Sequence, residues 1–141
     1  LETASQAILA QERDLMLAQH YRQPYCLGII TWKVVAPDQS AASLAQSHQV
    51  LHRLVDTLKA NLRRVDILTQ FQPGMVTVGL YGLDQYLADK RFQDLLAPLS
   101  QQSWLRENTV VQFYHYLATA PEDGTTLFAL RQTLNMQLRH L

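Results

Sequence analysis

Hydrophobic and polar residues follow two different periods along the chain, and these periods predict an alternation of helices and strands. Apolar residues recur at helical spacing in four segments, which are 2–21, 43–64, 83–99 and 126 to the end. Runs rich in β-branched and aromatic residues predict strands over 25–35, 66–71, 75–81 and 109–119. This order indicates an α+β fold, in which a sheet is covered by helices.

Turn and capping residues mark the borders of these elements. Ser43 with Gln46 forms a capping box, and Thr126 caps the last helix. Gln72-Pro73-Gly74 joins two strands as a hairpin, and the segment 121–124 forms a turn. We expect one face of the third helix to carry its large apolar residues, which are Leu83, Tyr86, Leu87, Leu95, Leu96 and Leu99.

The length and composition fit one packed core. With 141 residues, 48% of them hydrophobic, the chain predicts a single domain over 1–141, into which residues 1–24 lead as an N-terminal helix. The chain starts at Leu1 without a Met, so we expect it to be a fragment of a longer protein.

The charge balance excludes several classes of partner. Twelve Lys and Arg against twelve Asp and Glu leave no basic field to hold a nucleic acid polymer or an anionic membrane. No apolar run is long enough to span a bilayer, and Cys26 as the one cysteine permits neither a disulfide nor a cysteine metal cluster. We therefore expect a cytoplasmic domain that does not insert into a membrane.

Three stretches of sequence carry a resemblance to a known family. The helix ending in Leu58-Lys59-Ala60-Asn61-Leu62-Arg63-Arg64-Val65-Asp66 is followed at a fixed distance by the hairpin Gln72-Pro73-Gly74-Met75-Val76. Ala118-Thr119-Ala120-Pro121-Glu122-Asp123-Gly124-Thr125 precedes the last helix. Over roughly residues 25 to 141, these stretches resemble the GGDEF domain family, whose active members are diguanylate cyclases that make cyclic di-GMP from two GTP.

The resemblance also shows where this chain departs from an active cyclase. Phosphoryl transfer with GTP needs a divalent metal held by carboxylates. The metal-binding Asp of the family's first strand is Thr31 here, and the metal-binding and catalytic acidic pair of the hairpin is Gly74 and Met75. The chain therefore predicts a catalytically inactive domain with no catalytic residues, no metal and no cofactor.

Positions that contact the nucleotide in the family are changed as well. The two glycines of the signature become Gln72 and Pro73, Ala36 replaces a phosphate-facing Lys, and His48 replaces a guanine-reading Asp. These changes strengthen the prediction of inactivity, because positioning supplies most of this chemistry.

The Arg63-x-x-Asp66 motif is retained. It resembles the inhibitory site of the family, which binds cyclic di-GMP. An Arg fork suits guanine or phosphate, and a carboxylate accepts from guanine N1 and N2. Arg91 or Lys90 is a candidate second cation, although the corresponding family position is Asp94. The alternative is that Arg63 complements the dipole of its helix and pairs with Asp66 at the surface.

Other reactive or aromatic residues are interpreted as structural. His48 and His52 lie at i, i+4 without a Cys or acidic partner at ligand spacing. Cys26 lies in an apolar strand, where a thiol is not activated. The aromatic residues Phe113, Tyr114 and Tyr116 lack the interleaved cations of a base-stacking sheet.

Three functions remain open at this point. The first is a receptor for cyclic di-GMP that uses Arg63, Asp66 and Arg91 and signals to an attached output domain or a separate partner protein. The second is a structural or dimerising scaffold, in which the N-terminal helix mediates association into a homodimer. The third is a nucleotidyl cyclase with a rebuilt site, which would require carboxylates that the sequence does not offer at the expected positions.

Overall fold

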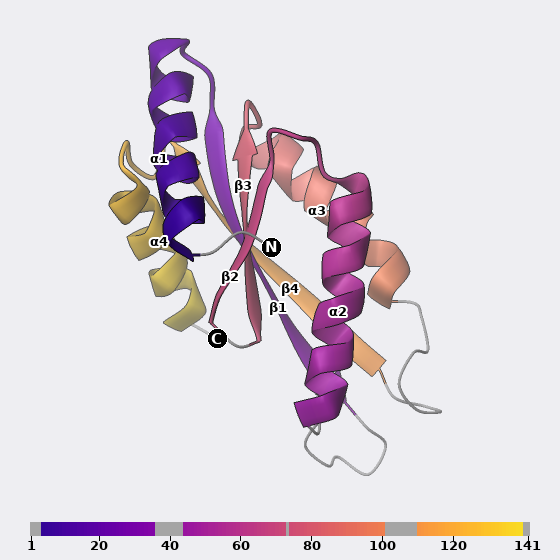
Figure 1. Cartoon of the computed structure of the whole chain (residues 1–141). Coiled ribbons are helices and arrows are strands. Elements are labelled where there is room, and N and C mark those ends of the chain that lie inside the picture. The colour runs from indigo at the N-terminus through magenta and orange to yellow at the C-terminus, as the bar shows by residue number, and fades with distance from the viewer. Residues whose placement is uncertain (1–3, 36–43, 73, 101–109, 140–141) are drawn as a thin grey trace.

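The computed structural model describes residues 4–35, 44–72, 74–100 and 110–139. Four helices and four strands follow one another in the predicted order (Figure 1). They are α1 (Ala4–His20), β1 (Tyr25–Val35), α2 (Leu44–Asn61), β2 (Ile67–Gln72), β3 (Met75–Tyr81), α3 (Gln85–Ser100), β4 (Val110–Ala120) and α4 (Leu127–Arg139). The α+β fold predicted from the sequence is confirmed.

The four strands form one antiparallel sheet in the order β2-β3-β1-β4. β1 lies inside the sheet and pairs with β3 on one side and with β4 on the other. A strand that is buried on both faces needs apolar residues at nearly every position, and the sequence of β1 provides them. The hairpin between β2 and β3 pairs Gln72 with Met75, as its turn residues predict.

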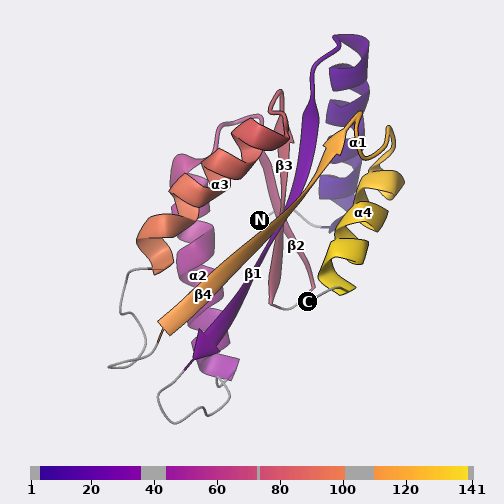
Figure 2. The same ribbon diagram turned by 180° about the vertical axis from the view of Figure 1, so that it is seen from behind.

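Helices α2 and α3 cover one face of the sheet, and α1 and α4 cover the other (Figures 1 and 2). Successive residues of β1 alternate between the two cores: Cys26 and Ile30 pack on the α2 and α3 side, and Leu27 and Ile29 on the α1 and α4 side. Gly28 lets α3 approach closely, because a Cβ there would lie 2.7 Å from the ring of Phe92.

Two details differ from the sequence prediction. α2 ends at Asn61 rather than at Arg64, because the side chain of Asp66 accepts the backbone N–H of Arg63 and turns the chain there. The buried face of α3 is only partly the predicted one. Leu96 and Leu99 are buried as expected, but Tyr86 and Leu87 are 74% and 46% exposed. The residues of α3 that are buried are Ala88, Phe92, Leu96 and Leu99.

The predicted turn and cap before α4 are confirmed. The backbone N–H of Thr119 donates to the Asp123 carboxylate at 2.8 Å, and the N–H of Asp123 donates back to the Thr119 carbonyl at 2.7 Å. Thr126 Oγ1 accepts from the N–H of Ala129 at 3.1 Å. The predicted capping box at Ser43 and Gln46 lies outside the residues whose side chains are described.

None of the helices described has both the length and the apolar character needed to cross a bilayer.

Candidate functional site

The positions that correspond to the family's metal site lie side by side in the sheet. Thr31 of β1 is the register partner of Met75 at the start of β3. Gly74 precedes Met75 in the exposed turn, with a φ of 78° that suits glycine. At the place where the resemblance expects three carboxylates, this chain therefore presents a hydroxyl, a thioether and a residue with no side chain.

The surroundings of Thr31 are those of a packed sheet. Burial raises the pKa of the neighbouring Tyr116, Tyr114 raises it further, and a hydrogen bond with Thr31 acts in the opposite direction. Across the described ranges, no group of three or more His, Cys, Asp or Glu side chains is placed to hold a metal ion. Ala36 and Pro73, and the side chain of Gln72, lie outside what the structure describes.

Arg63 and Asp66 are brought together just after the end of α2. The Asp66 carboxylate accepts the Arg63 backbone N–H at 2.8 Å, and the guanidinium contacts it through Nη2 at 2.8 Å and Nε at 3.3 Å. Nη2 also donates to the Tyr81 carbonyl at 2.8 Å, which ties this loop to the end of β3. The side chain of Asp66 is 0% exposed and that of Arg63 is 40% exposed.

This geometry assigns different roles to the two residues of the motif. The Asp66 carboxylate is fully enclosed, and its oxygens are occupied by Arg63. Arg63 follows the last residue of α2 by two positions and pairs with Asp66, so the pairing that the alternative expects is present, although the Asp66 side chain is enclosed rather than at the surface. The Arg63 guanidinium still has an exposed edge that a ligand can reach.

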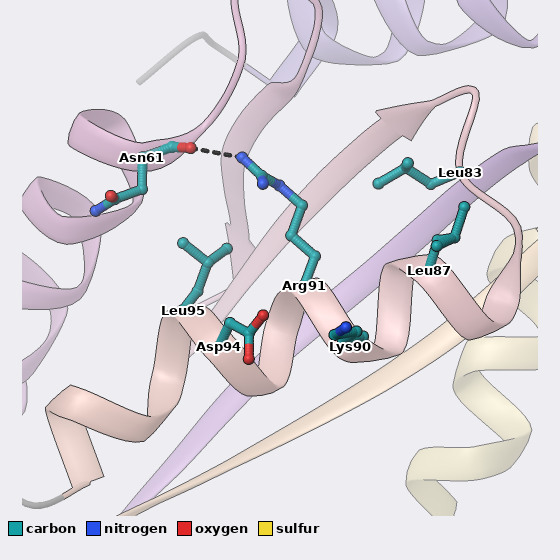
Figure 3. Close-up of a pocket in the computed structure, with 7 residues that line it drawn as sticks. All are labelled: Asn61, Leu83, Leu87, Lys90, Arg91, Asp94 and Leu95. Atoms are coloured by element: carbon teal, nitrogen blue, oxygen red, sulfur yellow. Dashed lines mark hydrogen bonds between the residues drawn. The ribbon is translucent and has the colours of Figure 1, made fainter.

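A groove of about 430 Å³ lies between the end of α2, the start of α3 and the loop that precedes α3. We call it the α2–α3 groove, and Figure 3 shows its lining residues, which are Asn61, Leu83, Leu87, Lys90, Arg91, Asp94 and Leu95. We call the contacts of Arg63 with Asp66 and with the Tyr81 carbonyl the clasp. Two groove residues lie close to it in sequence: Asn61 precedes Arg63 by two positions, and Leu83 follows Tyr81 by two. Arg63 and Asp66 do not themselves line the groove, and Asp66 lines another pocket, which α1 borders.

Arg91 reaches across the groove from α3 to the end of α2 (Figure 3). Its Nη2 donates to the Asn61 carbonyl at 2.6 Å. Its Nε is buried and has no hydrogen-bond partner in the structure. A buried donor without a partner is costly, and because this atom is enclosed, a ligand in the groove would reach it only if the Arg91 side chain shifted.

The remaining groove residues combine charge with apolar surface. Lys90 and Asp94 are exposed on successive turns of α3 (Figure 3), and Leu87 presents 46% of its surface. Two cations, one carboxylate and leucine side chains suit a ligand with phosphates and a flat base. The structure thus places the predicted Arg91 and Lys90, together with Asp94, along one groove.

The other residues considered in the sequence lie on the surface of α2 or in and against the two cores. Contrary to the sequence interpretation, His52 has an acidic partner, since it lies 3.3 Å from Asp56 at an exposed position of α2. His48 is exposed on the same helix. Burial raises the pKa of the Cys26 thiol from 9.0 to about 12. Phe113 packs against the core beneath α2 and α3, and Tyr116 against the core beneath α1 and α4.

A contact between β4 and α3 was not predicted. His115 of β4 contacts Asp89 of α3 at 2.6 Å, and its ring stacks on Phe92 with centroids 5.5 Å apart. Gln93 donates to the other oxygen of Asp89 at 2.7 Å. The residues are 26 positions apart in the chain, so no local sequence pattern could have revealed the contact.

No family model and no curated protein matches the sequence. Solved structures do match the fold. The GGDEF domain of YfiN, or TpbB, from Pseudomonas aeruginosa has a TM-score of 0.78 and 17% identity, covering 99% of this chain and 89% of its own. The active GGEEF domain of a diguanylate cyclase from Vibrio cholerae has a TM-score of 0.79 and 10% identity, covering 96% and 87%.

A third similar structure contains a ligand. The GGDEF domain of DgcB from Caulobacter crescentus, in complex with cyclic di-GMP, has a TM-score of 0.73 and 9% identity, and the match covers 92% of this chain and 78% of that one. All three identities are low, so the likeness establishes the architecture. The chain has the fold of a GGDEF domain.

Proposed function

We propose that the chain is a catalytically inactive GGDEF-type signalling domain that binds cyclic di-GMP in the α2–α3 groove. Occupancy of the groove by the ligand is signalled to an attached output domain or to a separate partner protein. The observation that carries the proposal is the lining of this groove, in which Arg91, held toward the Asn61 carbonyl, lies with Lys90 and Asp94.

The inactive part of the proposal is supported by the pairing of Thr31 with Met75. These two positions meet where the family resemblance expects metal ligands, and neither side chain is a carboxylate. Mg²⁺ binds hard oxygen ligands, and a thioether is a soft one. Incubation with GTP and Mg²⁺, followed by chromatography, is expected to yield no cyclic di-GMP. Metal-dependent product formation would overturn this part.

The binding part is supported by the chemistry around the groove. Cyclic di-GMP has two phosphates and two guanines, and a guanidinium fork binds either group. Lys90 and Arg91 supply positive charge, and the Arg63 guanidinium is held in one orientation by Asp66. Asp66 is then a positioning residue. The DgcB structure, which contains cyclic di-GMP, shows that a domain of this fold binds that ligand.

Isothermal titration with cyclic di-GMP tests the binding part. The unmodified domain is expected to bind, and Arg91→Ala is expected to weaken binding by about tenfold or more, because it removes a charge-assisted contact. Arg63→Ala is expected to act in the same direction. Arg139→Ala is the matched control, because it removes one arginine from α4, which covers the opposite face of the sheet.

Thermal melting of each variant shows whether it is folded. Loss of binding in folded Arg91→Ala, with normal binding in Arg139→Ala, supports the groove. The proposal would be contradicted if the unmodified domain did not bind cyclic di-GMP. It would also be contradicted if Arg139→Ala weakened binding as much as Arg91→Ala.

A scaffold is the second candidate function, and one observation favours it. Large apolar side chains are exposed on α1, with Leu9 at 68%, Met16 at 70% and Leu17 at 43%. Such residues suit association with another chain. The scaffold predicts that cyclic di-GMP leaves the melting temperature unchanged and that the mass in solution is that of a dimer. A ligand-dependent rise in melting temperature favours the receptor instead.

A further inference from the structure

We infer that Asp94 is the residue that selects guanine in the α2–α3 groove. This inference rests on the proposed binding of cyclic di-GMP and goes beyond it, because it names the group that distinguishes guanine from adenine.

Asp66, the carboxylate that the sequence motif suggests for this role, is not available in the structure. Its side chain is 0% exposed, and Arg63 donates to both of its oxygens. A base could reach these oxygens only if the clasp opened and the Arg63 backbone N–H lost its acceptor. Leaving such a donor unpaired is unfavourable.

Asp94 offers the acceptor that Asp66 cannot. It lies one helical turn after Lys90 and three residues after Arg91, and all three line the groove (Figure 3). Asp94 is exposed, and it makes no hydrogen bond or ion pair with any residue that the structure describes. Its carboxylate therefore has both oxygens open to a ligand, beside two cations that suit the phosphates.

The chemistry of a carboxylate favours one base. An ionised carboxylate only accepts hydrogen bonds. The Watson–Crick edge of guanine presents two donors, N1–H and the N2 amino group, and a carboxylate can accept from both. Adenine presents an acceptor at N1 and a donor at N6, so one carboxylate oxygen would face a lone pair. An asparagine has one donor and one acceptor, which matches adenine better.

The experiment measures dissociation constants for cyclic di-GMP and cyclic di-AMP with the unmodified domain, Asp94→Asn and Asp56→Asn. The two dinucleotides share the backbone and phosphates, so their ratio isolates the base. Asp56→Asn makes the same change of charge on α2, at a residue that does not line the groove. The linear dinucleotide of guanine is included to separate recognition of the base from recognition of the cyclic sugar-phosphate backbone.

The unmodified domain and Asp56→Asn are expected to prefer cyclic di-GMP by about tenfold or more. Asp94→Asn is expected to lose that preference or reverse it, while melting at the same temperature. An unchanged preference in Asp94→Asn would overturn the role of Asp94 and leave the receptor proposal standing. Absence of binding by the unmodified domain to every dinucleotide would overturn both.

Discussion

Asp66 ends α2 and fixes the loop that follows, because its buried carboxylate accepts the Arg63 N–H and the Arg63 guanidinium. We expect Asp66→Ala to lower the free energy of unfolding by about 1–3 kcal/mol, since it leaves these donors without their acceptor. Asp66→Asn keeps one acceptor oxygen and should lose less. Urea unfolding measures both values. Equal stability of Asp66→Ala and the unmodified domain would show that the clasp contributes nothing.

Cys26 links stability to alkaline pH. Burial raises the pKa of its thiol from 9.0 to about 12, so the thiol of the unfolded chain ionises first as the pH rises. The free energy of unfolding should therefore be unaffected below pH 9 and fall between pH 9 and 12, by at most about 1.4 kcal/mol per pH unit. Burial also raises the pKa of Tyr25, which adds a further loss above pH 10.

Cys26→Ala isolates the contribution of the thiol. Its unfolding free energy, measured in urea at pH 8, 9, 10 and 11, should fall less steeply than that of the unmodified domain. Tyr25 is present in both proteins and cancels in the comparison. Parallel pH profiles would mean that the thiol does not ionise differently in the two states.

Residue types could be read from the sequence, but the partners of the residues could not. The sequence predicted Arg63, Asp66 and Arg91 as one set. In the structure Arg63 and Asp66 contact each other, whereas Arg91 lines the α2–α3 groove, which neither of them lines. The sequence could not show that Asp66 is enclosed or that Arg91 donates to the Asn61 carbonyl, because both depend on where α2 ends relative to α3.

At the scale of elements, α1 docks on the sheet through an unusual face. Its buried residues include Gln11, which is 0% exposed and whose amide oxygen and nitrogen have no hydrogen-bond partner in the structure. The hydroxyl of Tyr25 is also buried without a partner, next to the same glycine, Gly79. Buried polar atoms without partners weaken the packing of the element that carries them.

We expect Gln11→Met to stabilise the docking of α1, because it removes both polar atoms and nearly keeps the shape of the side chain. The free energy of unfolding should rise by about 1–3 kcal/mol. Hydrogen exchange should slow along α1. The control Gln132→Met changes an exposed residue of α4 and should have little effect. Destabilisation by Gln11→Met would contradict the interpretation of this interface.

The elements themselves were predictable, because their signals are local. The apolar run of β1 and the turn residues at Pro73 and Gly74 identify strands and a hairpin without reference to the rest of the chain. The buried face of α3 was predictable only in part: Leu96 and Leu99 are buried as the helical period predicts. Tyr86 and Leu87 fit the helical period, but the sheet selects Ala88 and Phe92 because Gly28 makes room there for an aromatic ring.

At the scale of the whole molecule, the sheet separates two regions that the family resemblance treats differently. The first is the pairing of Thr31 with Met75, where carboxylates are replaced. The second is the α2–α3 groove, where charged residues remain. Under the proposed function, this separation would let the domain lose catalysis and keep a ligand-binding site.

The most direct test of this account is a titration with cyclic di-GMP followed by amide ¹H–¹⁵N NMR spectra, because it locates binding on the fold. The account predicts shifts concentrated at Asn61, Lys90, Arg91 and Asp94, and around Arg63. Shifts concentrated at Gly74 and Met75, or a spectrum that cyclic di-GMP leaves unchanged at millimolar concentration, would contradict it.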